Sequence, residues 1–218
     1  MSLTLYLHPL SSFCQKTLIA LYENAIPFEP RIIRLEDAAS RAELTALWPL
    51  AKFPVLKDAR KNGETRVVPE TSVIIEYLQQ YFPGKTKLIP DDFEVAWKAK
   101  LADRFYDLYV NLPVGKIVTD TFRPTGKNDP HGVAEAKALI ETTYGVIEKD
   151  MAKRTWAAGE EFTIADCAAA PALFFANKLI PLKNSCKNGA AYFDRLRQRP
   201  SVARAFAEAE PYLKLFPG

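Results

Sequence analysis

The stretch His8-Pro9-Leu10-Ser11-Ser12-Phe13-Cys14-Gln15-Lys16 lies near the start of the chain, between a strand pattern and a helix pattern. Before it, Leu3-Thr4-Leu5-Tyr6-Leu7 alternates in the way that predicts a strand. After it, apolar side chains recur at helical spacing over residues 13–24, with Ser11 or Ser12 as the natural N-cap. A helix start offers unpaired N–H groups and the positive end of the helix dipole. This place therefore suits an anion, and a thiolate is an anion.

The next segments predict a small α/β unit. Strand patterns occupy residues 28–34, 51–57 and 65–68, and the strand within 51–57 begins at its proline, Pro54. Helix patterns occupy residues 41–47 and 70–82. The order is therefore β-α-β-α-β-β-α. A helix joins the first two strands, so they should run parallel, whereas the turn at Lys61-Asn62-Gly63-Glu64 should make the last two antiparallel.

The second part of the chain is almost wholly helical in pattern. Residues 83–92 have the composition of a linker, and helices are predicted over residues 93–112, 131–151, 164–177, 192–198 and 201–208. Thr163-Ile164-Ala165-Asp166 is a capping box with Asp in place of the usual Glu or Gln. We expect an α/β domain over residues 1–82, the linker over 83–92, and an all-helical domain over 93–218.

Composition limits the classes of function. A net charge of +3 on 218 residues gives no case for nucleic acid binding. Three scattered cysteines do not make a disulfide framework and suit a reducing compartment. With no close cysteine pair and only two histidines, we expect no metal site. The N-terminus has no secretory leader pattern, and the longest apolar run, residues 167–176, is too short to span a bilayer. These features predict a cytoplasmic protein without membrane contact.

Three further places carry candidate binding groups. Phe53-Pro54 is an X-Pro bond, at which the cis peptide has only a small free-energy cost. A cis bond would leave the backbone of Phe53 free to pair with an extended ligand. The alternative is a trans proline on an edge strand. Glu70-Thr71 either caps a helix or receives the ammonium and carboxylate groups of a ligand. Lys52 either holds a second carboxylate or is simply solvated.

The order and spacing of these features resemble the cytosolic glutathione transferases, and the resemblance covers nearly the whole length. It rests on the S-x-x-C step from Ser11 to Cys14 and on three further segments, Lys52-Phe53-Pro54-Val55-Leu56, Glu70-Thr71-x-x-Ile74-x-x-Tyr77-Leu78 and Gly159-x-x-Phe162-Thr163-Ile164-Ala165-Asp166.

The resemblance implies a thioredoxin-like domain that binds glutathione, followed by a helical domain that shapes the acceptor site. Pro54 would be cis, and Phe53 would pair through its backbone with the cysteinyl part of glutathione. Glu70 and Thr71 would hold the γ-glutamyl end, and Lys52 the glycine carboxylate. Ser11 and Phe13 would complete the glutathione-binding set. The family also implies a homodimer and a role in detoxification.

The identity of the group that contacts the glutathione sulfur stays open. Ser11 aligns with the catalytic serine of the zeta- and theta-like classes, including bacterial ones, and Ser12 is one residue on. Cys14 sits where thioredoxin-like redox motifs carry their second cysteine, but with Ser11 in the first place there is no dithiol pair. A free thiol has a pKa of about 8.5, and a hydroxyl donor at a helix start would stabilise its thiolate. A packing role for Cys14 is favoured over a mixed disulfide with glutathione.

We therefore expect an enzyme that transfers glutathione to a small, largely apolar electrophile. Leu10, Asp103 and Tyr106 are the candidate acceptor-site residues. Asp103, Arg104 and Tyr106 could instead contact a dimer partner, and Tyr106 and Phe105 could equally be core. One rival is isomerase, peroxidase or thiol reductase chemistry on the same thiolate, although Phe13 replaces the cysteine that is usual in zeta-like enzymes. The other rival is a non-catalytic interaction module that keeps only the fold.

Overall fold

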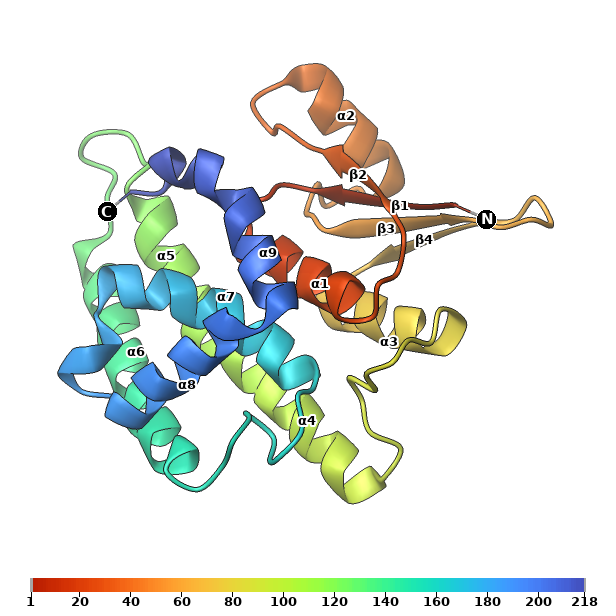
Figure 1. Ribbon diagram of the computed structural model, residues 1–218. Coiled ribbons are helices and arrows are strands. Elements are labelled where there is room, and N and C mark those ends of the chain that lie inside the picture. Colours follow the sequence, from red (N-terminus) through yellow and green to blue (C-terminus); the bar gives the residue numbers. More distant parts are fainter. Residues whose placement is uncertain (1, 218) are drawn as a thin grey trace.

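The computed structural model describes residues 2–217. Its single sheet has the strand order β2-β1-β3-β4, formed by β1 (Ser2–Leu7), β2 (Glu29–Ile32), β3 (Val55–Ala59) and β4 (Thr65–Pro69). Strand β1 pairs parallel with β2 and antiparallel with β3, and β3 pairs antiparallel with β4. The predicted β-α-β-α-β-β-α order and the predicted strand directions are confirmed (Figure 1).

Two helices, α1 (Ser12–Glu23) and α3 (Thr71–Tyr81), lie on one side of the sheet, and α2 (Ala38–Leu47) lies on the other (Figure 1). Several ends differ from the sequence prediction. Strand β3 starts at Val55, directly after the proline at which the strand was predicted to begin, because Pro54 has no N–H to give to a ladder. Helix α2 starts three residues early, because the Asp37 carboxylate accepts a hydrogen bond from the N–H of Ala39 (3.0 Å).

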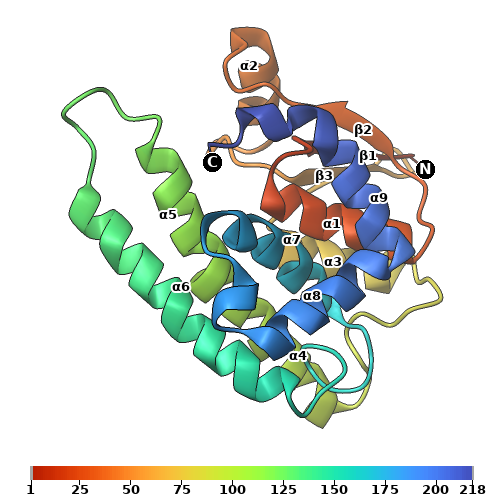
Figure 2. The ribbon, with the colours of Figure 1, turned by 60° about the vertical axis from the view of Figure 1, so that its left-hand side comes forward.

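The remaining helices form the second half of the molecule, in which α7 and α9 pack against α1. They are α4 (Phe93–Tyr106), a π-helical turn η1 (Asp107–Asn111), α5 (Leu112–Asp120), α6 (Pro130–Met151), α7 (Ile164–Leu179), η2 (Leu182–Asn184), α8 (Lys187–Gln198), α9 (Pro200–Ala209) and η3 (Glu210–Leu215). Helix α6 runs alongside α5, and α7 lies in the middle of this group (Figure 2).

Helix α4 does not end near residue 112 as predicted, because η1 and α5 continue it to Asp120. The N–H of Leu112 donates to the C=O of Asp107, five residues back, which is the π-helical bond. Pro113 follows, and a proline can give no hydrogen bond to the C=O four residues earlier. That group, the C=O of Tyr109, instead accepts from the hydroxyl of Thr143 on α6 (3.2 Å). The irregular turn is thus stabilised by a neighbouring helix.

A shared core joins the sheet half to the helical half. Buried side chains of α1, such as Leu18 and Ile19, belong to the same apolar cluster as those of α7, such as Ala169 and Leu173. Helix α1 packs against both α7 and α9. The start of α1 therefore has a fixed position beside the helical half.

The predicted capping box at the start of α7 is confirmed. The Thr163 hydroxyl accepts from the N–H of Ala165 (3.3 Å), and the Asp166 carboxylate accepts from the N–H of Thr163 (2.8 Å). Asp166 is fully buried and also accepts from the hydroxyl of Tyr192 (2.6 Å). Burial raises the pKa of Asp166, despite these hydrogen bonds.

Across residues 2–217, no helix is both long enough and apolar enough to cross a membrane.

Candidate functional site

A polar cavity of about 230 Å³ opens where the start of α1, the loop before β3 and the start of α3 meet the end of α4. It contains six of the seven glutathione-binding residues that the family resemblance implies, and the seventh, Ser11, lines the second cavity described below. Its lining residues are Phe13, Trp48, Lys52, Phe53, Pro54, Glu70, Thr71, Arg104, Asp107, Leu108 and Leu112.

The loop before β3 offers its backbone to this cavity. The Phe53–Pro54 peptide bond is cis, as the family resemblance implies. Within residues 2–217, neither the N–H nor the C=O of Phe53 makes a backbone hydrogen bond. The neighbouring Lys52 is exposed at the same cavity. This loop can therefore pair with an extended ligand and supplies a cation beside it.

Glu70 and Thr71 form the opposite wall. Glu70 is the N-cap residue of α3, but its carboxylate makes no capping hydrogen bond, so the sequence alternative of a plain capping acid is wrong. Its backbone has φ of 69°, in the left-handed region that is costly for a residue other than glycine. Thr71 is the first residue of α3. A free carboxylate beside a helix start can hold an ammonium and a carboxylate side by side.

A second, apolar cavity of about 290 Å³ lies on the other side of the α1 start. Its walls come from α1, η1, α5, α7 and the C-terminal segment. The lining residues are Leu10, Ser11, Ser12, Phe13, Asn111, Leu112, Val114, Gly115, Val118, Phe122, Phe175, Leu215 and Phe216.

Phe13 and Leu112 line both cavities and so form their common wall. The first cavity includes four charged side chains, those of Lys52, Glu70, Arg104 and Asp107, whereas the other is lined almost wholly by hydrocarbon. The two cavities therefore adjoin at the side chains of Phe13 and Leu112. The arrangement suits the joining of a polar, extended molecule to an apolar one.

Both candidate serines border the apolar cavity at this wall. The Ser11 hydroxyl accepts a hydrogen bond from the N–H of Cys14 (3.4 Å), as an N-cap does, and its own hydrogen stays available to donate. Ser12 is the first residue of the helix. The preceding turn is fixed because His8 Nδ1 accepts from the N–H of Leu10 (3.2 Å). Burial lowers the pKa of His8, so its ring is neutral and suited to that role.

Cys14 is in a different environment. Its side chain is fully buried, and its sulfur accepts a weak hydrogen bond from the N–H of His8 (3.5 Å). Burial raises the pKa of this thiol to about 12, although the contacts with Ser11 and His8 act in the other direction. A protonated, buried thiol is a poor nucleophile, so this environment favours the packing role.

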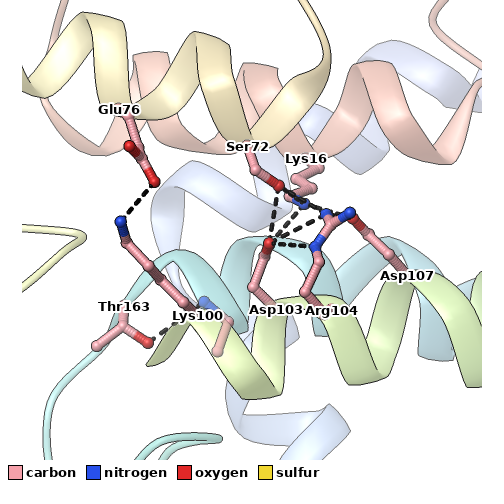
Figure 3. Close-up of polar contacts among 9 residues, drawn as sticks. Lys16, Ser72, Glu76, Lys100, Asp103, Arg104, Asp107 and Thr163 are labelled. Carbon is pink, nitrogen blue, oxygen red and sulfur yellow. Dashed lines mark hydrogen bonds and ion pairs between the residues drawn. The ribbon is translucent and has the colours of Figure 1, made fainter. Parts of the chain in front are cut away.

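Beneath the polar cavity lies a buried ionic network (Figure 3). The ammonium of Lys16, only 1% exposed, lies 2.5 Å from Asp103 and 2.7 Å from Asp107, and it donates to the hydroxyl of Ser72 (3.0 Å). Arg104 also donates to the Ser72 hydroxyl (2.7 Å) and to both carboxylates. Since Ser72 follows Thr71, and Arg104 and Asp107 line the cavity, the network ties α1 and α4 to the cavity wall.

Two sequence candidates lie outside the apolar cavity. Asp103 is buried in the network, and Tyr106 is buried, lining a separate groove between α4 and α6. The lining residues that sequence reasoning missed include Trp48, Asp107 and Asn111. Asp107 follows Asp103 by one helical turn, a spacing that could have flagged it. No such signal marks Asn111, which is the last residue of the π-helical turn. Residues 2–217 bring no three His, Cys, Asp or Glu side chains together as metal ligands.

Comparison with known proteins identifies the family. The family model described as the glutathione S-transferase N-terminal domain matches residues 5–86, and the C-terminal domain model matches residues 110–200. The chain belongs to the glutathione S-transferase family.

Several relatives match over almost the whole length. A glutathione S-transferase of Pseudomonas putida is 26% identical over 212 residues, covering 94% of this chain and 92% of the relative. FtsZ-localized protein A of Caulobacter vibrioides is 27% identical over 219 residues, covering 96% and 93%. The crystal structure of a glutathione S-transferase from Methylobacillus flagellatus, with glutathione bound, has a TM-score of 0.83 at 24% identity, covering 94% of this chain and 98% of that one.

Proposed function

We propose that the protein is a glutathione transferase that binds glutathione in the polar cavity and conjugates it to a small apolar electrophile in the other. The observation that carries the proposal is the common wall of Phe13 and Leu112, with the serine hydroxyls beside it. Residues 1–82 would then be the glutathione-binding domain, 83–92 the linker and 93–218 the acceptor domain. A cytoplasmic homodimer is part of the proposal, and three buried free cysteines fit a reducing compartment.

Glutathione fits the polar cavity group by group. Glu70 and the start of α3 at Thr71 suit the ammonium and carboxylate of the γ-glutamyl end. The unpaired backbone of Phe53 suits the cysteinyl peptide, and Lys52 suits the glycine carboxylate. This placement directs the sulfur toward the start of α1.

Transfer requires the thiolate. The hydroxyl of Ser11 would donate a hydrogen bond to the sulfur, and the dipole of α1 would add to the stabilisation of its charge. The thiol proton leaves to water. The sulfur then forms a bond with the electrophilic carbon, at which either a leaving group departs with its electron pair or a double bond opens.

The test is a set of matched variants. Ser11→Ala should lower kcat/KM with an aryl halide by roughly 10- to 100-fold, since a hydrogen bond to a charged group contributes about 1.5–3 kcal/mol. It should also raise the pKa of bound glutathione, measured by the ultraviolet absorbance of the thiolate.

Cys14→Ala is the control at the same helix start, and its effect on turnover should be several-fold smaller. A larger loss of turnover in Cys14→Ala than in Ser11→Ala would assign the chemistry to the cysteine. If Ser12→Ala shows the loss of kcat/KM expected for Ser11→Ala, and Ser11→Ala shows none, the hydrogen-bond donor is Ser12 instead of Ser11.

A second candidate is a binding module that keeps the fold without catalysis, and the similarity to FtsZ-localized protein A is the observation that favours it. A thermal-shift titration separates the two. Glutathione should raise Tm if the polar cavity binds it, whereas no shift at millimolar glutathione would favour the module.

A further inference from the structure

His8 contacts segments that form both cavities, although it is a lining residue of neither. It directly follows β1, and its ring is half-buried. The ring stacks with Phe53 at 6.2 Å between centroids and meets the ring of Tyr212 edge-on at 5.1 Å. Phe53 lines the polar cavity, whereas Tyr212 belongs to η3, which contributes Leu215 to the apolar cavity. One side chain therefore joins a wall segment of each cavity.

The same residue helps to fix the turn that carries Ser11. Residues 8–11 form a β-turn in which the N–H of Ser11 donates to the C=O of His8 (2.9 Å) and Pro9 takes the second position. Inside the turn, His8 Nδ1 accepts from the N–H of Leu10 (3.2 Å), in the manner of an Asx turn. Leu10 and Ser11 both line the apolar cavity. The imidazole thus helps to hold the N-cap hydroxyl of α1 in place.

The hydrogen bond inside the turn exists only while the ring is neutral. An N–H group can donate to Nδ1 only if that nitrogen carries no hydrogen, so the neutral ring has its hydrogen on Nε2. Burial lowers the pKa of His8 below its ordinary value of 6.5, so the ring is neutral at neutral pH. In acid, a new hydrogen on Nδ1 would face the hydrogen of Leu10, and the bond would be lost. The backbone bond of the turn would remain, and Leu10 and Ser11 would gain freedom to shift.

The ionisable groups around His8 come from three neighbouring segments. Burial has the largest effect on the pKa of His8, while Glu36 raises it and Arg34 lowers it from the loop after β2. On α1, burial raises the pKa of the Cys14 thiol to about 12, and its sulfur accepts from the N–H of His8 (3.5 Å). On η3, Tyr212 brings a phenol beside the ring. The thiol stays protonated where His8 titrates, so the imidazole is the group that links the turn to pH.

Resting on the proposed function, we propose that His8 is a positioning residue for the transfer reaction, whose neutral ring holds the turn of Leu10 and Ser11 and whose protonation releases it. Release moves the Ser11 hydroxyl from the place where it would donate to the glutathione sulfur, so the thiolate loses part of its stabilisation. Glu70 and Thr71, on the opposite wall of the polar cavity, keep their places. The chemistry should therefore suffer more than the binding of glutathione.

Two substitutions separate the acceptor nitrogen from the ring. His8→Phe keeps an aromatic ring beside Phe53 and Tyr212 but removes the acceptor. It should lower kcat/KM with an aryl halide by about 10-fold, since a small misplacement of a reacting group can cost up to about 100-fold. It should also raise the pKa of bound glutathione, read from the absorbance of the thiolate. The Kd for glutathione should stay within about threefold. His8→Asn places an oxygen where Nδ1 lies, so it should recover most of the lost turnover.

The effect of His8→Phe should pass through Ser11. In a Ser11→Ala background, which lacks the hydroxyl, adding His8→Phe should lower kcat/KM by less than about twofold, because the two changes remove the same interaction. Losses that multiply in the double variant would show that His8 acts elsewhere, and they would overturn its positioning role. An unchanged pKa of bound glutathione in His8→Phe would overturn it as well.

The acid limb of the pH profile gives a measurement that needs only the parent and His8→Asn. At saturating glutathione, both the bound thiol and His8 must lose a proton in the parent. Log kcat/KM should therefore fall with a slope of about two below both pKa values. His8→Asn has no imidazole, so its profile should fall with a slope of about one. Circular dichroism at each pH confirms that both proteins stay folded.

The results separate this role from the proposed function. Equal slopes in the parent and His8→Asn, with turnover by both at neutral pH, would overturn the role of His8 and leave the transferase standing. The absence of turnover by the parent at any pH would overturn the transferase, and this role with it.

Discussion

Helix α1 makes two ionic contacts with the helical half of the chain, and the two differ in burial and in surroundings. The first contact is that of Lys16, which is buried between Asp103 and Asp107 beneath the polar cavity. At its last residue, Glu23 accepts hydrogen bonds from Arg199 (2.8 Å) and Ser201 (2.7 Å) near α9, where Arg199 is a quarter exposed.

The two contacts differ in whether they share residues with the candidate site. The Lys16 contact shares Ser72, Arg104 and Asp107 with the wall of the candidate site. The Glu23 contact shares no residue with either cavity. Both contacts fasten the same helix, so variants at the two positions differ in whether the site changes along with stability.

The largest expected effect follows from Lys16→Met. Removing one partner of a buried ion pair leaves an uncompensated charge, so the free energy of unfolding should fall by about 3–5 kcal/mol. Glutathione affinity should fall as well, because Ser72 loses the Lys16 donor and the two acids that pair with Arg104 lose their second cation. Urea unfolding and calorimetric titration with glutathione measure the two effects. A loss of stability with unchanged affinity would make the network purely structural.

A second substitution refines this prediction. With Lys16 gone, the two acids face Arg104 alone, and Asp103→Asn restores the balance of one acid and one base. The double variant should recover about 1–2 kcal/mol relative to Lys16→Met, because neighbouring charges are not additive. Urea unfolding of both single variants and the double variant gives the coupling. Additive losses would show that the charges act independently.

The smallest effect is expected for Glu23→Gln, at about 1 kcal/mol, with unchanged glutathione affinity. This loss should depend on pH. Burial by itself raises the pKa of Glu23, but the hydrogen bonds from Arg199, Ser201 and Thr86 outweigh it, and the net pKa lies below the usual 4.5. A depressed carboxyl pKa gives stability that is present above pH 4.5 and is lost as the pH falls through the lowered value.

The measurement is the difference in unfolding free energy between the parent and Glu23→Gln across a pH series. The difference should be constant near neutral pH and should narrow below pH 4.5. A difference that stays the same down to pH 3 would mean that the carboxylate of Glu23 gains nothing from its charged form.

Much of the fold could be predicted from local patterns. Alternation and helical spacing located all four strands and the order of the first seven elements, because side-chain periodicity reports which face is buried. The capping box at Thr163 and Asp166 was predictable because a cap depends on neighbours in sequence. The true start of α2 was missed because the first residues after its N-cap, Asp37, include no large apolar side chain that would show helical spacing.

The site was predictable only in part. Lys52, Phe53, Glu70 and Thr71 lie in short motifs, and the structure brings them to one cavity. The partners from the helical half depend on packing between distant segments. Lys16 is buried among acids that lie 87 and 91 residues away in the sequence, so no local pattern predicts its burial. The position of Asn111 depends on a π-helical turn, which regular helical spacing does not predict.

The backbone of Glu70 has a consequence for how this position is expected to evolve. Its φ of 69° costs an L-residue on the order of 1 kcal/mol that a glycine does not incur. Selection for folding alone therefore favours glycine at position 70, and selection for an anion facing the cavity favours glutamate. Under the proposed function, a descendant that abandoned glutathione would have no reason to keep the side chain. In such a descendant, we expect glycine to replace glutamate at position 70 before any change in the fold.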